Sequence, residues 1–210
     1  MRYGSPAKKK EKPLTYNIII CGVGGQGVIS LATIIAESAN SENLFVKQVE
    51  VHGMAQRGGS VVSHIRISDA PIASNQIPFG KADMILSTEP LETVRHLPYL
   101  RTDTGTCITS TIPVTNIPDY PEITVIREQL SKLSGVVLID ADLFSDSSMS
   151  RKMLNVVLLG TASHYLPLQL NTIRSCLLAK FAINSDERKV ALVTAFDRGR
   201  AIGGSSIFSL

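Results

Sequence analysis

Five residues near the start of the chain have the types and spacing to bind an anion. They are Gly22, Gly24, Gly25, Gln26 and Gly27. Glycines allow positive φ angles and close approach of the backbone, and a helix that begins after them offers free N–H groups to a phosphate. The Gly-x-Gly-x-x-Gly spacing favours a dinucleotide such as NAD(P) or FAD, with Glu50 near the expected ribose-binding position. The alternative is that the glycines only allow tight packing of a strand on a helix.

A second glycine-bearing segment, residues 52–61, has the sequence HGMAQRGGSV. The Arg57 guanidinium could bind a carboxylate or phosphate through two parallel hydrogen bonds, and the Gln56 amide can donate and accept at once. Gly58 and Gly59 indicate a backbone of special shape. The competing interpretation is an ordinary surface turn with a solvated arginine. We take these four residues, with the first five, as candidates for binding an anion or lining an active site.

Strands are predicted on both sides of these two loops. The isoleucine-rich run 16–22 predicts a strand covered on both faces, and an apolar stripe from Val28 predicts a buried helix. The segment 60–68 follows a short loop rather than a crossover helix, so this strand is expected to run antiparallel, with His64 on its wetter face. Further strands are expected at 44–51, 82–87, 106–111 and 136–140.

Helices are predicted after several of these strands, at 89–97, 152–165, 170–181 and 186–198. Thr88 and Ser185 are the expected N-caps of the first and last of them, and residues 112–122, with three prolines, predict a loop. The alternation of elements predicts an α/β fold with three α/β/α layers, a largely parallel, mixed sheet and a Rossmann-like start. The expected domains are a basic leader at 1–13, a single domain at 14–200 and a C-terminal tail at 201–210.

Composition excludes several classes of protein. Of the 210 residues, 44% are apolar and 19% are charged, which suits a chain that fills a core. The net charge is +3, but residues 1–13 carry +4, so the remaining chain is near neutral. Neither a basic face with aromatic platforms for nucleic acid, nor a membrane span, nor a secretory signal is predicted. Three isolated cysteines lack the spacing of a zinc or iron–sulfur site, so we expect a cytoplasmic protein with no metal of its own.

Together, the two glycine segments resemble the gamma-type domain of the 2-oxoacid:ferredoxin oxidoreductases. GVGGQGV after a strand, followed by HGMAQRGGSV, is most similar to the small (beta) subunit within the indolepyruvate ferredoxin oxidoreductase branch. Other stretches also resemble family segments: STEPLE at 87–92, IDAD at 139–142, NVVLLG at 155–160 and AFDRG at 195–199. The resemblance covers about residues 15–200, and the leader and the C-terminal tail depart from it.

The resemblance implies a subunit of an oxidoreductase rather than a complete enzyme. Enzymes of this family oxidatively decarboxylate a 2-oxoacid, here an arylpyruvate such as indolepyruvate, and form acyl-CoA and reduced ferredoxin from coenzyme A and ferredoxin. They use thiamine diphosphate and [4Fe–4S] clusters. The chain has no Gly-Asp-Gly run typical of the family's thiamine sites, so a large (alpha) subunit is expected to carry both cofactors, and no catalytic residue is assigned to this chain alone.

Several roles stay open. The loops could stabilise anionic intermediates or guide the phosphates of coenzyme A. His52 is expected to anchor a loop and His64 to lie on a strand surface. Asp140, Asp142 and Asn155 could line an interface or cap a helix, and capping is the favoured interpretation. An apolar patch is expected where the partner, or a second copy of the isolated chain, docks. The alternatives are a stand-alone NAD(P)-binding protein that uses Glu50, and a non-catalytic nucleotide-sensing or assembly module.

Overall fold

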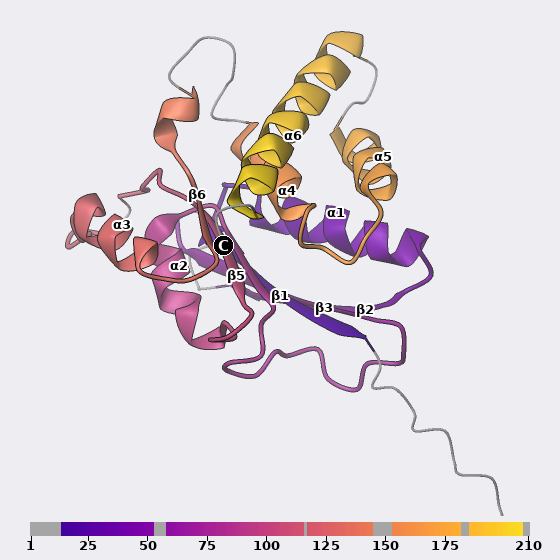
Figure 1. Ribbon diagram of the computed structural model, residues 1–210, viewed down its shortest axis with the longest axis horizontal. Helices are drawn as coiled ribbons and strands as arrows, with labels where there is room; N and C mark the ends of the chain where they lie inside the picture. The colour runs from indigo at the N-terminus through magenta and orange to yellow at the C-terminus, as the bar shows by residue number, and fades with distance from the viewer. Residues whose placement is uncertain (1–13, 53–57, 116, 145–152, 182–184, 208–210) are drawn as a thin grey trace, which may run out of the picture.

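A computed structural model describes residues 14–52, 58–115, 117–144, 153–181 and 185–207 of the chain (Figure 1). Its centre is a six-stranded sheet with the strand order β2-β3-β1-β4-β5-β6. The strands are β1 (Thr15–Val23), β2 (Phe45–His52), β3 (Ser60–Ser68), β4 (Met84–Ser87), β5 (Thr106–Ser110) and β6 (Val136–Ile139). Strand β3 pairs antiparallel with both β1 and β2, whereas β1, β4, β5 and β6 pair in parallel.

Helices cover both faces of this sheet, so the predicted α/β fold class with a largely parallel, mixed sheet is confirmed (Figure 1). One layer contains α1 (Val28–Ser41), α4 (Leu154–Ala162), α5 (Leu170–Phe181) and α6 (Asp186–Ile207). The opposite layer contains α2 (Pro90–His96) and α3 (Ile123–Ser131). Short 3-10 turns occur at Leu97–Tyr99 and Ala141–Phe144. Within the described ranges, no helix has the length and apolarity that crossing a membrane requires.

The isoleucines of β1 explain its central position. Ile18 and Ile20 belong to the larger apolar core, shared with α1, α4 and α6, while Ile19 belongs to a smaller core on the other face. All three are fully buried. Since side chains of a strand alternate between faces, an uninterrupted apolar run is stable only where both faces are covered.

Helices α4 and α6 touch through glycines. A Cβ atom on Gly160 of α4 would lie 2.1 Å from the Phe196 carbonyl oxygen, and one on Gly199 of α6 would lie 2.0 Å from the Val157 carbonyl oxygen. The Thr161 hydroxyl donates to the Gly199 carbonyl at 2.9 Å. The two backbones are therefore in direct contact, and α6 continues past the predicted end at 198 to Ile207.

Among the other local features, one helix was missed, one predicted N-cap was wrong and one is confirmed. Helix α3 was not predicted, because only Ile126 and Leu130 of its nine residues are buried and the apolar stripe is short. Thr88 does not cap α2; Glu89 does, by accepting from the Glu92 N–H at 2.8 Å. The predicted Ser185 cap is confirmed, because its hydroxyl accepts from the Arg188 N–H at 3.3 Å.

The predicted wet face of β3 is also wrong. His64 is 7% exposed and lies edge-on to the Tyr99 ring, with 5.3 Å between ring centroids. Its Nδ1 accepts from the Ile77 N–H at 3.1 Å. The segment after β3 folds back over this face, and burial lowers the pKa of His64, with the charge of His96 acting in the same direction.

Candidate functional site

The first glycine loop lies at the carboxyl end of β1, where four segments of the chain meet. Val23, the last residue of β1, pairs with Ser60, the first residue of β3. Thr88 follows the parallel neighbour β4, and its N–H donates to the Cys21 carbonyl at 3.0 Å. Asn155, in the first turn of α4, reaches the loop from the helical layer. In α/β sheets this edge is where ligands bind.

Two of the glycines are required by close contacts. A Cβ atom on Gly22 would lie 1.9 Å from the Thr88 hydroxyl oxygen. Gly27 has φ +80° and precedes α1, and a Cβ atom there would lie 2.2 Å from Nδ2 of Asn155. That same nitrogen donates to the Gln26 carbonyl at 2.6 Å. Asn155 therefore braces the glycine loop, and the prediction that it caps a helix was wrong.

The Gln26 side chain folds back onto its own loop. Its Oε1 accepts from the Val23 N–H at 2.8 Å and from the Thr88 hydroxyl at 2.9 Å. Its Nε2 donates to the Thr88 carbonyl at 3.4 Å. The amide is thus occupied in joining the loop to the segment after β4. This arrangement fixes the position of the α1 N-terminus, and any contact of Gln26 with a ligand stays a prediction.

The structure brings the second glycine segment directly against the first. The Gly24 N–H donates to the Gly59 carbonyl at 2.8 Å. Gly58 has φ +77° and open space around its Cβ position. Gln56 and Arg57 lie outside the described residues, so their predicted anion binding stays untested. Two loops separated by a helix and a strand in the sequence are one site in space.

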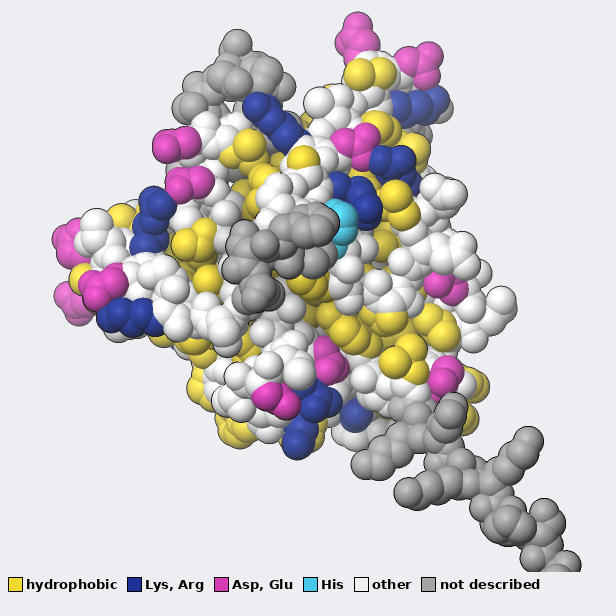
Figure 2. Space-filling model, in the orientation of Figure 1, with side chains coloured by type: hydrophobic (Ala, Val, Ile, Leu, Met, Phe, Trp, Pro, Cys, Tyr) yellow, Lys and Arg dark blue, Asp and Glu magenta, His cyan; other side chains and the backbone are white. Residues whose placement is uncertain are grey.

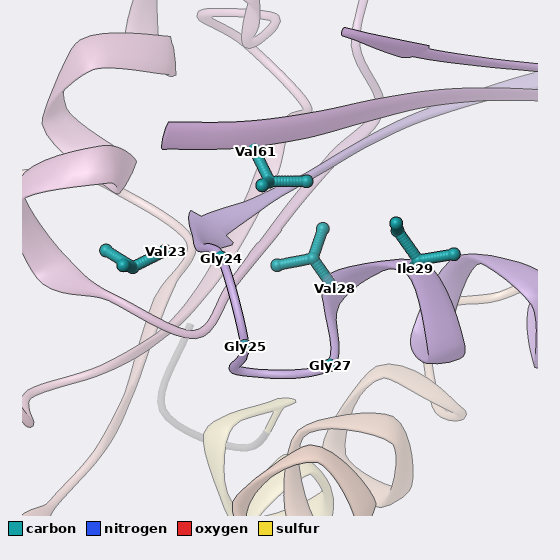
Figure 3. Close-up of a pocket in the computed structure, with 7 residues that line it drawn as sticks. All are labelled: Val23, Gly24, Gly25, Gly27, Val28, Ile29 and Val61. Atoms are coloured by element: carbon teal, nitrogen blue, oxygen red, sulfur yellow. The ribbon is translucent and has the colours of Figure 1, made fainter. Parts of the chain in front are cut away.

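Hollows lie on both sides of the first glycine loop. The smaller, of about 350 Å³, is lined by Val23, Gly24, Gly25, Gly27, Val28, Ile29 and Val61. Figure 3 shows the Val28 and Val61 side chains between β3 and the start of α1. The larger, of about 780 Å³, includes Gln26, Ser30, Asn155, Phe181, Arg188 and Leu192.

The electrostatics of both hollows favour an anion. The first N–H groups of an α-helix lack intrahelical acceptors, and the helix dipole adds a partial positive charge there. No acidic residue occupies the first turn of α1, and Arg188 adds a guanidinium to the larger hollow. The face in Figure 2 shows acidic and basic side chains interspersed rather than one broad basic surface. The groups that would attract an anion are therefore the start of α1 and Arg188, not a broad basic surface.

Two buried carboxylates beside the loop were not identified from the sequence. Glu89 and Glu92 are each 1% exposed. Glu89 Oε1 accepts from the Tyr120 hydroxyl and from the Val114 N–H, the latter at 3.3 Å. Glu92 Oε2 accepts from the Ser60 hydroxyl at 2.5 Å. The STEPLE stretch at 87–92 resembles a family segment, but its composition does not indicate that either glutamate is buried.

Glu50 is not brought to the glycine loop. It lies in β2, where its Oε1 accepts from Gln48 Nε2 at 2.9 Å. Strand β3 separates β2 from β1, so Glu50 is displaced by two strand spacings, roughly 10 Å. In a dinucleotide site the acidic strand is the direct neighbour of the first strand. The geometry therefore argues against the NAD(P) interpretation.

The cysteines do not suit an iron–sulfur cluster. A [4Fe–4S] cluster takes four thiolates, and the chain has three cysteines. Cys21 and Cys107 are buried, and burial raises the pKa of both, that of Cys107 to about 12. Within the described part of the chain, no group of three or more His, Cys, Asp or Glu side chains is placed to hold a metal ion. Three cysteines cannot supply the four thiolates of a [4Fe–4S] cluster.

Comparison with known proteins shows which proteins the chain resembles. The family model described as pyruvate ferredoxin/flavodoxin oxidoreductase matches residues 17–202. Indolepyruvate oxidoreductase subunit IorB from Methanothermobacter thermautotrophicus is 39% identical over 156 residues, which cover 71% of this chain and 79% of that protein.

Two solved structures share the fold. The 2-oxoglutarate:ferredoxin oxidoreductase from Magnetococcus marinus, with 2-oxoglutarate, coenzyme A and succinyl-CoA bound, has a TM-score of 0.71 and 20% identity. The match covers 93% of this chain but 32% of that one, so this chain spans about a third of its length. The keto/oxoacid ferredoxin oxidoreductase gamma subunit from Geobacter sulfurreducens has a TM-score of 0.64 and 18% identity, and the match covers 90% of this chain and 99% of that subunit.

Proposed function

This chain belongs to the pyruvate ferredoxin/flavodoxin oxidoreductase family, and from that membership we propose that it is the small subunit of an indolepyruvate-type 2-oxoacid:ferredoxin oxidoreductase. The complex oxidises an arylpyruvate, releases its carboxyl group as CO₂ and transfers the acyl group to coenzyme A. Electrons pass to ferredoxin. The relative with 39% identity is named as a subunit of indolepyruvate oxidoreductase, which supports this substrate class.

The observation that carries the proposal is the contact between the two glycine loops. The Gly24 N–H to Gly59 carbonyl bond, 2.8 Å long, holds the loops together beside the free N–H groups of α1. A phosphate group of coenzyme A at this helix start would gain hydrogen bonds and a favourable dipole. The bound coenzyme A in the structural neighbour from Magnetococcus marinus supports this ligand class.

The chemistry of decarboxylation requires groups that this chain does not offer. A thiamine diphosphate held by a large subunit would supply the electron sink for decarboxylation, and [4Fe–4S] clusters there would carry electrons to ferredoxin. With three cysteines and no thiamine motif, the chain leaves both to a large subunit in our proposal. Its own residues bind and orient coenzyme A at the glycine loops, and ferredoxin docks on the assembled complex.

Exposed apolar side chains support a docking surface. Phe45 and Val51 of the edge strand β2 are 47% and 52% exposed, and Phe79 is 68% exposed. Exposed apolar side chains along an edge strand, such as Phe45 and Val51, are typical of protein interfaces. In the proposed assembly the large subunit covers this side, and a second copy of the chain takes its place when the chain is isolated.

Reconstitution tests the proposal. The chain alone should show no arylpyruvate-dependent dye reduction, and activity should appear when a large subunit with thiamine diphosphate and clusters is added. Gly25→Ala in the complex should raise the KM for coenzyme A, because Gly25 has φ +96° in the loop. Gly80→Ala is the matched control, since Gly80 also has a positive φ, +66°, and open space around it, but lies away from the loops.

Two results would contradict the proposal. The first is a failure of this chain to form any active complex with such a large subunit. The second is micromolar binding of NADH to the chain alone, measured by fluorescence titration, together with an unchanged KM for coenzyme A in Gly25→Ala. That pair of results would favour a stand-alone nucleotide-binding protein.

A further inference from the structure

We propose that Glu92 is a positioning residue that holds the two glycine loops in register, an inference that rests on the proposed function. Its carboxylate is buried, and Oε2 accepts from the Ser60 hydroxyl at 2.5 Å. Ser60 directly follows Gly59, whose carbonyl accepts from the Gly24 N–H. Ser60 also pairs with Val23 at the end of β1. Glu92 therefore binds β3 at Ser60, next to the place where the first loop follows β1 and the second loop precedes β3.

The charge of Glu92 suits this role. Its Oε1 accepts from Nη1 of Arg95 at 2.5 Å, so both carboxylate oxygens have donors. A carboxylate without partners is expensive to bury, while hydrogen bonds to an ionised acceptor are about twice as strong as those between neutral groups. The Ser60 bond is therefore stronger than an ordinary hydroxyl contact. This bond connects helix α2 to strand β3 on the face of the sheet opposite α1.

Glu89 provides a matched comparison on the same helix. It is as deeply buried as Glu92, but its Oε1 binds Tyr120 and the Val114 N–H, which belong to the segment after β5. Its Oε2 caps α2 by accepting from the Glu92 N–H at 2.8 Å. Both acids stabilise the fold, and Glu92 alone of the two bonds to Ser60. Removing the Glu92 bond to Ser60 should therefore loosen the contact between the glycine loops. Glu89→Gln, which keeps one side-chain oxygen to accept from the Glu92 N–H, should not.

Hydrogen exchange in the assembled two-subunit complex tests the positioning role without an activity assay. Ser60→Ala and Glu92→Gln should each accelerate exchange of the Gly24 amide by roughly 10-fold or more, the factor for a lost hydrogen bond to a charged group. Ser60→Thr keeps the hydroxyl and should restore slow exchange. Glu89→Gln should leave the Gly24 amide unchanged. Unchanged Gly24 exchange in Ser60→Ala, which keeps the Glu92–Arg95 pair, overturns the proposal.

Kinetics with coenzyme A as the varied substrate provides the functional readout. Ser60→Ala and Glu92→Gln should each raise the KM for coenzyme A by about 10-fold with a much smaller change in kcat, and the double variant should match the single ones. A KM raised by Gly25→Ala but unchanged in both variants contradicts the link to ligand binding. A KM unchanged in all of them, including Gly25→Ala, counts against the proposed coenzyme A site, and Gly24 exchange still decides whether Glu92 positions the loops.

Discussion

Replacing Gly27 by alanine tests whether Asn155 braces the glycine loop. The new Cβ would lie 2.2 Å from the Asn155 Nδ2 atom, which must then leave the Gln26 carbonyl. Alanine in the left-handed region costs about 1–2 kcal/mol, and the lost hydrogen bond about 1 kcal/mol. We expect a total loss near 2–3 kcal/mol, which lowers the Tm of a domain of this size by roughly 4–12 °C.

Urea denaturation of the purified chain, followed by circular dichroism, measures this loss. Gly25→Ala is the control, because φ is +96° there and nothing lies near the Cβ position; it should lose only the backbone contribution. In an Asn155→Ala background, Gly27→Ala should also cost only the backbone contribution, so the double-mutant cycle should show coupling of about 1 kcal/mol. Additive losses in the cycle, or equal losses in Gly25→Ala and Gly27→Ala, would refute the bracing role.

Three further predictions concern other parts of the fold. Gly160→Ala should destabilise the chain by roughly 3 kcal/mol, because its Cβ would meet the backbone of α6. Gly204→Ala is the control, because its Cβ would make only ordinary contacts at 3.5 Å. It should be neutral or stabilising in the same urea denaturation assay. Burial lowers the pKa of His64. The neutral ring therefore contributes stability above about pH 6.5, and this stability is lost as the pH falls through the lowered pKa. Between pH 7.5 and pH 5, the urea midpoint of His64→Gln should fall less steeply with decreasing pH than that of the unmodified chain. Iodoacetamide at pH 8 should label the partly exposed Cys176 of the native chain well before Cys107, whose pKa is raised to about 12; mass spectrometry of digested samples checks this, and equal labelling would contradict it.

The elements around β1 could be predicted because their signals are local. An apolar run that needs cover on both faces, a glycine turn and a helical stripe from Val28 follow one another directly in the sequence. The antiparallel direction of β3 followed from the short connection before it, too short for a crossover helix. These inferences depend on neighbours in the chain, and the structure confirms them.

The bracing contacts of the site could not be predicted, because they depend on tertiary packing. Asn155 and Gln26 are 129 residues apart in the sequence, and their pairing depends on how α4 lies on the sheet. The alternation of residue types in β3 correctly assigned its side chains to two faces of the sheet. It could not show that the segment containing Ile77 covers the face on which His64 lies. Glu89 and Glu92 look like ordinary charges at a helix start, and only the fold reveals that they are buried.

The long sequence separation within the site has a consequence for protein synthesis. The loop at Gly27 leaves the ribosome early, while Asn155 follows 128 positions later. At translation rates of 5–20 residues per second, the loop waits roughly 6–26 s for the side chain that braces it. The nascent chain can pair β1 with β3 well before that moment, but it acquires the finished loop only once Asn155 has been made and α4 has packed on the sheet.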